Sequence, residues 1–87
     1  MREQLLEITG GQPLQFYDGY DDAILGVGFQ YTKDPVVVYD RTKFLAICMK
    51  TNDWDEDEAW EYLSQNTFYA WIGPQTPIFL DQPQELE

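Results

Sequence analysis

A chain of 87 residues has room for one hydrophobic core, and a composition of 44% hydrophobic and 16% aromatic residues excludes a disordered protein. Its formal net charge of −11 argues against direct binding of nucleic acid and against docking on anionic membranes, because both need Lys and Arg side chains. One cysteine and no His exclude an internal disulfide and remove the commonest catalytic base.

The N-terminal part of the chain predicts a short helix followed by a connection. Apolar residues among charged ones favour a helix over residues 2–8, and Gly10 and Gly11 end it. Residues 10–13 are typical of a loop, and the pair Asp18-Gly19 predicts a turn.

Two strands that form a hairpin are predicted next. Residues 23–31 fit either a helix or a strand, but Gly26 and Gly28 would each cost a helix about 1 kcal/mol relative to Ala. Their β-branched and aromatic neighbours favour a strand. Turn-forming residues then lead to residues 36–39, three valines and a tyrosine, which give the clearest strand pattern in the chain.

Two helices follow the hairpin. Asp40 or Thr42 can cap a helix over residues 41–50, which places Phe44, Leu45 and Cys48 on one face and predicts that Cys48 is buried. A second helix is predicted over residues 55–68, where Asp55 and Glu58 have the spacing of a capping box; Asp53 and Glu56 fit the same template. Its buried stripe is expected to contain Ala59, Tyr62, Leu63, Asn66 and Ala70.

Residues 77–80 predict a last strand, at a sheet edge because Pro77 cannot donate a ladder hydrogen bond. The predicted fold class is therefore α+β, a small antiparallel sheet with strands near residues 23–31, 36–39 and 77–80 covered by helices near 41–50 and 55–68. We expect one compact domain over residues 1–80, and an acidic, flexible tail over residues 81–87.

After Lys50 the chain contains acidic residues and no Lys, Arg or His. With i, i+4, i+8 spacing, Asp53, Asp57 and Glu61 would form an acidic ridge on one helix face; a plain solvated face is the simpler alternative. The hypothetical partner-binding site consists of this ridge and two nearby tryptophans: Asp53, Trp54, Asp57, Trp60 and Glu61. Trp54, Trp60 and Trp71 are expected at the core or its rim, although the sequence leaves the exposure of Trp54 and Trp60 open.

A calcium site is the first chemical alternative for these acids. Asp53, Asp55 and Asp57 match the first three ligands of an EF-hand loop, but Glu58 stands where that loop needs Gly and Ser64 where it needs a closing acid. We therefore expect an acid-rich helix start, which complements the helix dipole, and no metal site.

Carboxylate catalysis is the second alternative. The acids that flank the predicted strand ends are Asp18, Asp21, Asp22 and Asp40. Ordinary turn chemistry explains these residues, and the sequence supplies no base beside a nucleophile, no oxyanion donors and no phosphate loop. The sequence predicts no catalytic residue and no cofactor.

Several blocks resemble a family of small hypothetical proteins encoded by tailed bacteriophages: residues 17–27, residues 35–41, residues 57–59 with 61–62, residues 70–73 and residues 76–79. The chain departs from the family pattern at Thr51–Trp54, in place of a short Gly-containing turn, and at Ser64–Asn66 in the helix middle. The resemblance implies a phage accessory protein and assigns no catalytic residue.

Three functions follow from these observations. The first is a non-catalytic accessory protein that binds and modulates a host or phage protein with a basic surface. The second is a DNA mimic that occupies the basic groove of a nucleic-acid-binding protein, and the third is a small carboxylate-dependent enzyme. The N-terminus lacks the pattern of a signal peptide and no apolar run spans a membrane, so the host cytoplasm is the expected location. The oligomeric state stays open.

Overall fold

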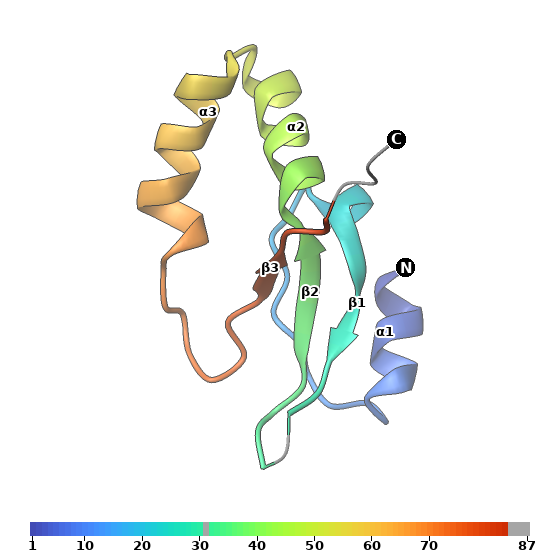
Figure 1. Ribbon diagram of the computed structural model, residues 1–87. Coiled ribbons are helices and arrows are strands. Elements are labelled where there is room, and N and C mark those ends of the chain that lie inside the picture. Colours follow the sequence, from blue (N-terminus) through green and yellow to red (C-terminus); the bar gives the residue numbers. More distant parts are fainter. Residues whose placement is uncertain (31, 84–87) are drawn as a thin grey trace.

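The computed structural model describes residues 1–30 and 32–83 and has an α+β fold, as the sequence predicts. Figure 1 shows the elements in chain order: α1 (Arg2–Ile8), a 3-10 turn (Asp21–Ala23), β1 (Ile24–Gly28), β2 (Val36–Asp40), α2 (Arg41–Asn52), α3 (Glu56–Leu63), a π-helical segment (Ser64–Phe68) and β3 (Ile78–Leu80). Tyr31 of the predicted first strand and residues 84–87 of the predicted tail lie outside the described residues.

The three strands form a mixed sheet in the order β1-β2-β3. β1 pairs antiparallel with β2, which confirms the predicted hairpin, and Leu25 is the extra residue of a bulge in this ladder. β3 pairs parallel with β2, with Val38 opposite Ile78. The prediction of an antiparallel sheet is therefore wrong for β3. The reason is the long connection through α2 and α3, which lets the chain re-enter the sheet in the direction of β2.

Local capping sets the bounds of α2. The Asp40 carboxylate accepts the N–H of Lys43 at the start of the helix. The helix runs two residues beyond the predicted end, to Asn52, whose side-chain amide donates to the carbonyl of Cys48. It ends where Asp53 takes a left-handed conformation with φ 57°.

The start of α3 confirms the predicted capping box. The N–H of Glu58 donates to the Asp55 carboxylate at 2.8 Å, and the N–H of Asp55 donates to the Glu58 carboxylate at 3.1 Å. Beyond Leu63 the backbone changes to a π-helix, so the predicted helix over residues 55–68 is helical throughout but not uniformly α-helical.

Part of the predicted buried stripe is exposed in the structure. Ala59 and Leu63 are buried as predicted. Tyr62 is 46% exposed and Asn66 is also exposed, so their assignment to the buried stripe is wrong. The wider π turn carries Thr67, rather than Asn66, to the buried line after Leu63.

Removal of the Asp55 cap gives a direct test of this local structure. We expect Asp55→Ala to lower the free energy of unfolding by about 1 kcal/mol, because the N–H of Glu58 then has no side-chain acceptor. Urea unfolding monitored by circular dichroism measures this change. Asp55→Asn keeps an acceptor and removes the charge, so we expect it to lie within a few tenths of a kcal/mol of wild type. Equal losses in both variants would assign the effect to charge instead of capping.

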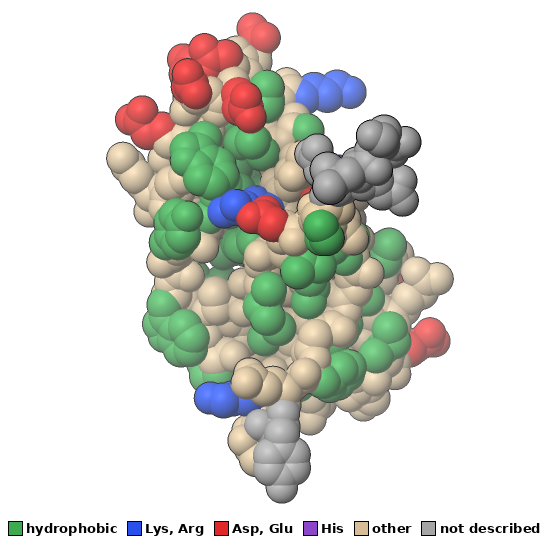
Figure 2. Space-filling view, in the orientation of Figure 1, with side chains coloured by type: hydrophobic (Ala, Val, Ile, Leu, Met, Phe, Trp, Pro, Cys, Tyr) green, Lys and Arg blue, Asp and Glu red, His purple; other side chains and the backbone are tan. Residues whose placement is uncertain are grey.

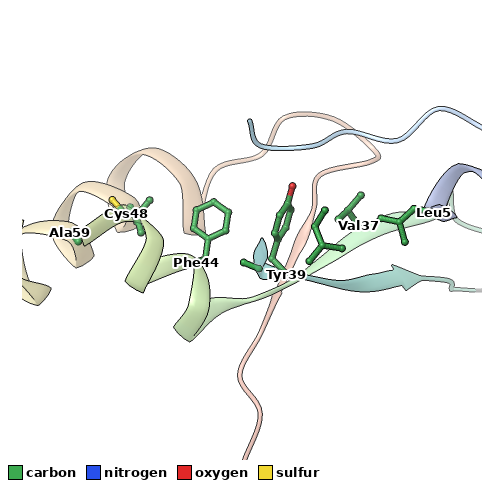
Figure 3. Close-up of a cluster of buried hydrophobic side chains, with 9 residues drawn as sticks. Leu5, Val37, Tyr39, Phe44, Cys48 and Ala59 are labelled. Atoms are coloured by element: carbon green, nitrogen blue, oxygen red, sulfur yellow. The ribbon is translucent and has the colours of Figure 1, made fainter. Parts of the chain in front are cut away.

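The core lies between one face of the sheet, α1 and the α2–α3 pair. Figure 3 shows a continuous row of buried side chains: Leu5 of α1, Val37 and Tyr39 of β2, Phe44 and Cys48 of α2, and Ala59 of α3. The N–H of Tyr17 donates to the hydroxyl oxygen of Tyr39 at 2.8 Å, so this buried oxygen has a partner. Cys48 is free and fully buried, as predicted.

Trp71 is not part of this core. Its side chain is 76% exposed, so the prediction that Trp71 lies at the core or its rim is wrong. The centre of the core is already filled by a cluster of aromatic rings around Phe44: Tyr17, Tyr20, Tyr39, Phe68 and Phe79. Trp71 instead lies in the connection that leads to β3.

Candidate functional site

Acidic side chains gather at the end of the molecule where α2 meets α3, which is the top of Figure 2. We call this region the acidic end and define it by six exposed residues: Asp53, Asp55, Glu56, Asp57, Glu58 and Glu61. The ion pairs found among residues 1–30 and 32–83 join Arg2 to Asp18 and Asp21, and Arg41 to Asp81. None of them involves the acidic end, so its charge faces solvent.

The predicted three-acid ridge does not form on a single helix. Asp57 and Glu61 lie one turn apart on α3. Asp53 lies in the turn before α3, where it ends α2 in the left-handed conformation. The cause is Asp55, which caps α3 and keeps Asp53 outside it.

Trp54 is packed beside Tyr62 of α3, with ring centroids 5.3 Å apart and planes inclined by 59°. Trp54 is half-buried against the core and Tyr62 is 46% exposed. Together they form one wall of an open notch of about 470 Å³, which we call the aromatic-acidic notch; it is lined by Trp54, Glu58, Glu61, Tyr62, Gln65 and Asn66. The notch therefore combines two aromatic rings with two carboxylates.

Trp60 does not line this notch. The Arg41 guanidinium lies 4.9 Å from its ring centroid, and the ring of Phe68 lies 5.5 Å away. Arg41 in turn donates to both carboxylate oxygens of Asp81, at 2.7 Å for the Nε to Oδ1 bond. Trp60 thus belongs to a separate cluster with Arg41, although its ring is still 38% exposed.

The structure brings together Trp54 and Glu61 from the predicted partner-binding site, and it adds residues that the sequence analysis missed. The added notch residues are Glu58, Tyr62, Gln65 and Asn66. A helical spacing signal was present, because positions 58, 61, 62, 65 and 66 follow i, i+3, i+4, i+7, i+8. The assignment of Tyr62 and Asn66 to the buried stripe concealed it.

Three of the four carboxylates considered for catalysis make structural contacts, and the fourth, Asp22, is exposed. Arg2 donates to both oxygens of Asp21 at 2.9 Å and to Asp18 at 3.2 Å. The hydrogen bond with Asp21 raises the pKa of the Arg2 guanidinium above its usual value. Asp40 caps α2. Within the described part of the chain, no three or more His, Cys, Asp or Glu side chains are grouped so that they would hold a metal ion.

No helix among residues 1–30 and 32–83 is both long enough and apolar enough to cross a membrane. Comparisons with protein-family models, with curated proteins and with solved structures each found no match to this chain.

Proposed function

We propose that this chain is a non-catalytic accessory protein of a tailed bacteriophage, which acts in the host cytoplasm and binds a host or phage protein through a basic segment of that partner. The phage assignment depends on the resemblance of the sequence blocks between residues 17 and 79. The binding function depends on the aromatic-acidic notch, which is the observation that carries the proposal.

The chemistry of the notch fits an Arg or Lys side chain. The rings of Trp54 and Tyr62 offer aromatic surface on which a guanidinium stacks, and Glu58 and Glu61 supply negative charge beside them. Elsewhere in this structure Arg41 makes the same combination of contacts, over the ring of Trp60 and against the carboxylate of Asp81. A partner's Arg in the notch would reproduce an arrangement that this chain already uses internally.

The surrounding charge supports a partner with several basic residues. Four acids of the acidic end lie outside the notch and make no ion pair in the described structure. Asp55 caps α3, which leaves Asp53, Glu56 and Asp57 available to a second and third basic side chain. Charges at the rim of such a site mainly steer and orient the partner, while the notch supplies the specific contact.

A binding experiment with a basic peptide tests the notch. We expect an Arg octapeptide to bind the wild-type protein, and Glu58→Gln plus Glu61→Gln to weaken binding about 5- to 30-fold, since each exposed charge contact is worth roughly 0.5–1 kcal/mol. Glutamine at position 58 still fits a capping box, so α3 should stay folded. Isothermal titration calorimetry at near-physiological salt measures the dissociation constants.

The matched control removes the same charge from another helix. Glu3→Gln plus Glu7→Gln changes two exposed carboxylates of α1, and we expect about a twofold loss of affinity from the altered net charge. Equal losses in the two double variants would show that net charge alone attracts the peptide. Wild-type protein and the notch variant should also differ in which protein they retain from host lysate; failure of the wild type to retain a specific partner contradicts the proposed function.

DNA mimicry remains the second candidate because Asp57 and Glu61 form an exposed pair on α3. It has less support, since Asp53 does not extend this pair into a longer ridge on the helix. Once the partner is isolated, competition with duplex DNA separates the two functions. Displacement of DNA by wild type, and loss of displacement in Asp57→Asn plus Glu61→Gln, would indicate mimicry.

A further inference from the structure

One face of the sheet is covered by no helix or strand among residues 1–30 and 32–83. Val37 and Tyr39 of β2 are fully buried against the core, whereas Val36 and Val38, which point to the opposite face, remain partly exposed. In Figure 1 the helices and the connection before β1 leave the front of the sheet bare. We call this surface the open sheet face and define it by Leu25, Gly26, Gly28, Val36, Val38, Ile78 and Leu80.

The open sheet face is apolar. Leu25 is 45% exposed, Ile78 48% and Leu80 42%. At the hairpin end, Phe29 and Trp71 are more exposed still, and they line a hollow of about 570 Å³ together with Gly28, Val36 and Ile78. Figure 2 shows hydrophobic side chains spread over the middle of this view, away from the acidic end. Contiguous apolar surface of this kind marks an interface.

The relief of this face suits a second copy of itself. β1 contributes Gly26 and Gly28, which have no side chains, so the surface is recessed at these two positions. The space above Gly26 is open, because a Cβ placed there would find no atom within 4 Å. β3 contributes the exposed side chains of Ile78 and Leu80, so the surface protrudes along β3. β2 lies between the recessed strand β1 and the protruding strand β3. Two copies can face each other through this surface, related by a two-fold axis that runs parallel to β2 and midway between the two sheets. In that arrangement β3 of each copy packs on β1 of the other.

Among the described residues, the charges around the open sheet face are balanced. Lys33 and Asp34 lie at the hairpin end, and Arg41 pairs with Asp81 at the other end. Asp40 uses its carboxylate as the cap of α2. A strongly basic or acidic partner would gain little from these described residues, whereas a second copy brings the same balance of charges to the interface.

The chain exposes more surface than a folded monomer of its mass usually does. Its accessible area is 6322 Å², against roughly 5,300 Å² for an average monomer. The open sheet face is one contributor to this excess, and a standard interface buries ~800 Å² on each partner. The smallest dimension of the molecule is 22 Å, as expected for a sheet that is covered on one side only.

We propose that the open sheet face binds a second copy of this chain in a two-fold, face-to-face dimer. In this dimer Gly26 of one copy lies opposite Ile78 of the other, because both residues are level with Val38 of the central strand. Leu25, the bulge residue next to Gly26, then lies beside the same Ile78. The acidic ends of both copies then lie at the same end of the dimer and keep their notches free. The dimer is independent of the proposed function, which uses a different surface.

Sedimentation equilibrium with a charge substitution tests the interface. We expect the 10.2 kDa chain to sediment as a dimer, and Ile78→Lys to raise the dimer dissociation constant about 100-fold, because symmetry places the substitution in the interface twice. Ile8→Lys is the matched control: Ile8 is 58% exposed and lies on α1, which packs on the opposite face through Leu5. A wild-type monomer at all concentrations, or equal effects of both variants, overturns the proposal.

Cross-linking tests the same geometry without a destabilising charge. Leu25→Cys and Ile78→Cys proteins, mixed and then oxidised with diamide, should form a disulfide-linked heterodimer, whereas each variant alone should link poorly. Cys48 is fully buried and does not compete. Added salt should tighten the dimer, since it screens the repulsion between the two acidic ends. A dimer that weakens with salt, or that links equally well in each variant alone, overturns this arrangement.

Discussion

Replacement of Phe44 by Ala is expected to cost more stability than the other single substitutions considered for this domain. The Phe44 side chain is 1% exposed, and its ring stacks on Tyr20 at a centroid distance of 3.8 Å and meets Phe79 at 5.0 Å. Truncation of a buried Phe to Ala costs about 3–5 kcal/mol. A domain of this length has a total stability of roughly 4–13 kcal/mol, so the loss is a large fraction of the total and unfolds the variant if the wild type lies near the lower value.

Urea unfolding of dilute protein measures this loss. Tyr69→Ala is the control, because its ring is 73% exposed and its removal should change the free energy of unfolding by less than about 0.5 kcal/mol. If Phe44→Ala lowered the free energy of unfolding by less than about 1 kcal/mol, Phe44 would not be the centre of the core. Tyr20→Leu should then be tested as the next ring of the cluster.

High pH is expected to unfold the protein through its buried tyrosines. Burial raises the pKa of Tyr20 to about 12, and burial also raises the pKa values of Tyr17 and Tyr39. A tyrosine in the unfolded chain ionises near pH 10. Between these values the unfolded state loses protons that the folded state keeps. The free energy of unfolding is therefore unaffected by these tyrosines below about pH 10 and falls as the pH rises toward 12.

The test follows tyrosinate absorbance and far-UV circular dichroism during an alkaline titration. We expect part of the tyrosinate signal to appear only together with the loss of secondary structure. Tyr20→Phe keeps the ring on Phe44 and removes the hydroxyl, so it should move this transition to higher pH. Tyr69→Phe changes an exposed ring and should not move it. Full ionisation of the tyrosines in a protein that keeps its secondary structure would contradict the prediction.

The parts of the fold that follow from neighbouring residues were predictable. The Asp40 cap and the Asp55 box need only a short side chain and the N–H groups that follow it, so the sequence located both helix starts. The direction of β3 was not predictable in this way, because it depends on how the long connection through α2 and α3 returns to the sheet. The exposure of Trp71 was not predictable either, because it depends on which other aromatic rings fill the core.

The candidate site was predictable only in part for a related reason. Trp60 and Glu61 are neighbours in the sequence, but successive residues of a helix point about 100° apart. One therefore turns toward Arg41 and the other toward the notch. The sequence locates charge and aromatic residues along the chain, whereas the packing of α3 against α2 determines which of them share a surface.

The concentration of acids at one end also bears on how this protein meets a partner in solution. The acidic end carries six carboxylates, whereas at the hairpin end Lys33 is offset by Asp34, so the negative charge is concentrated at one end of the molecule. The field of a basic protein would rotate such a molecule during diffusion, so the first encounters would occur through the α2–α3 end. The charge segregation would thus raise the association rate, most strongly at low ionic strength, and leave the lifetime of the complex to Trp54 and its neighbours.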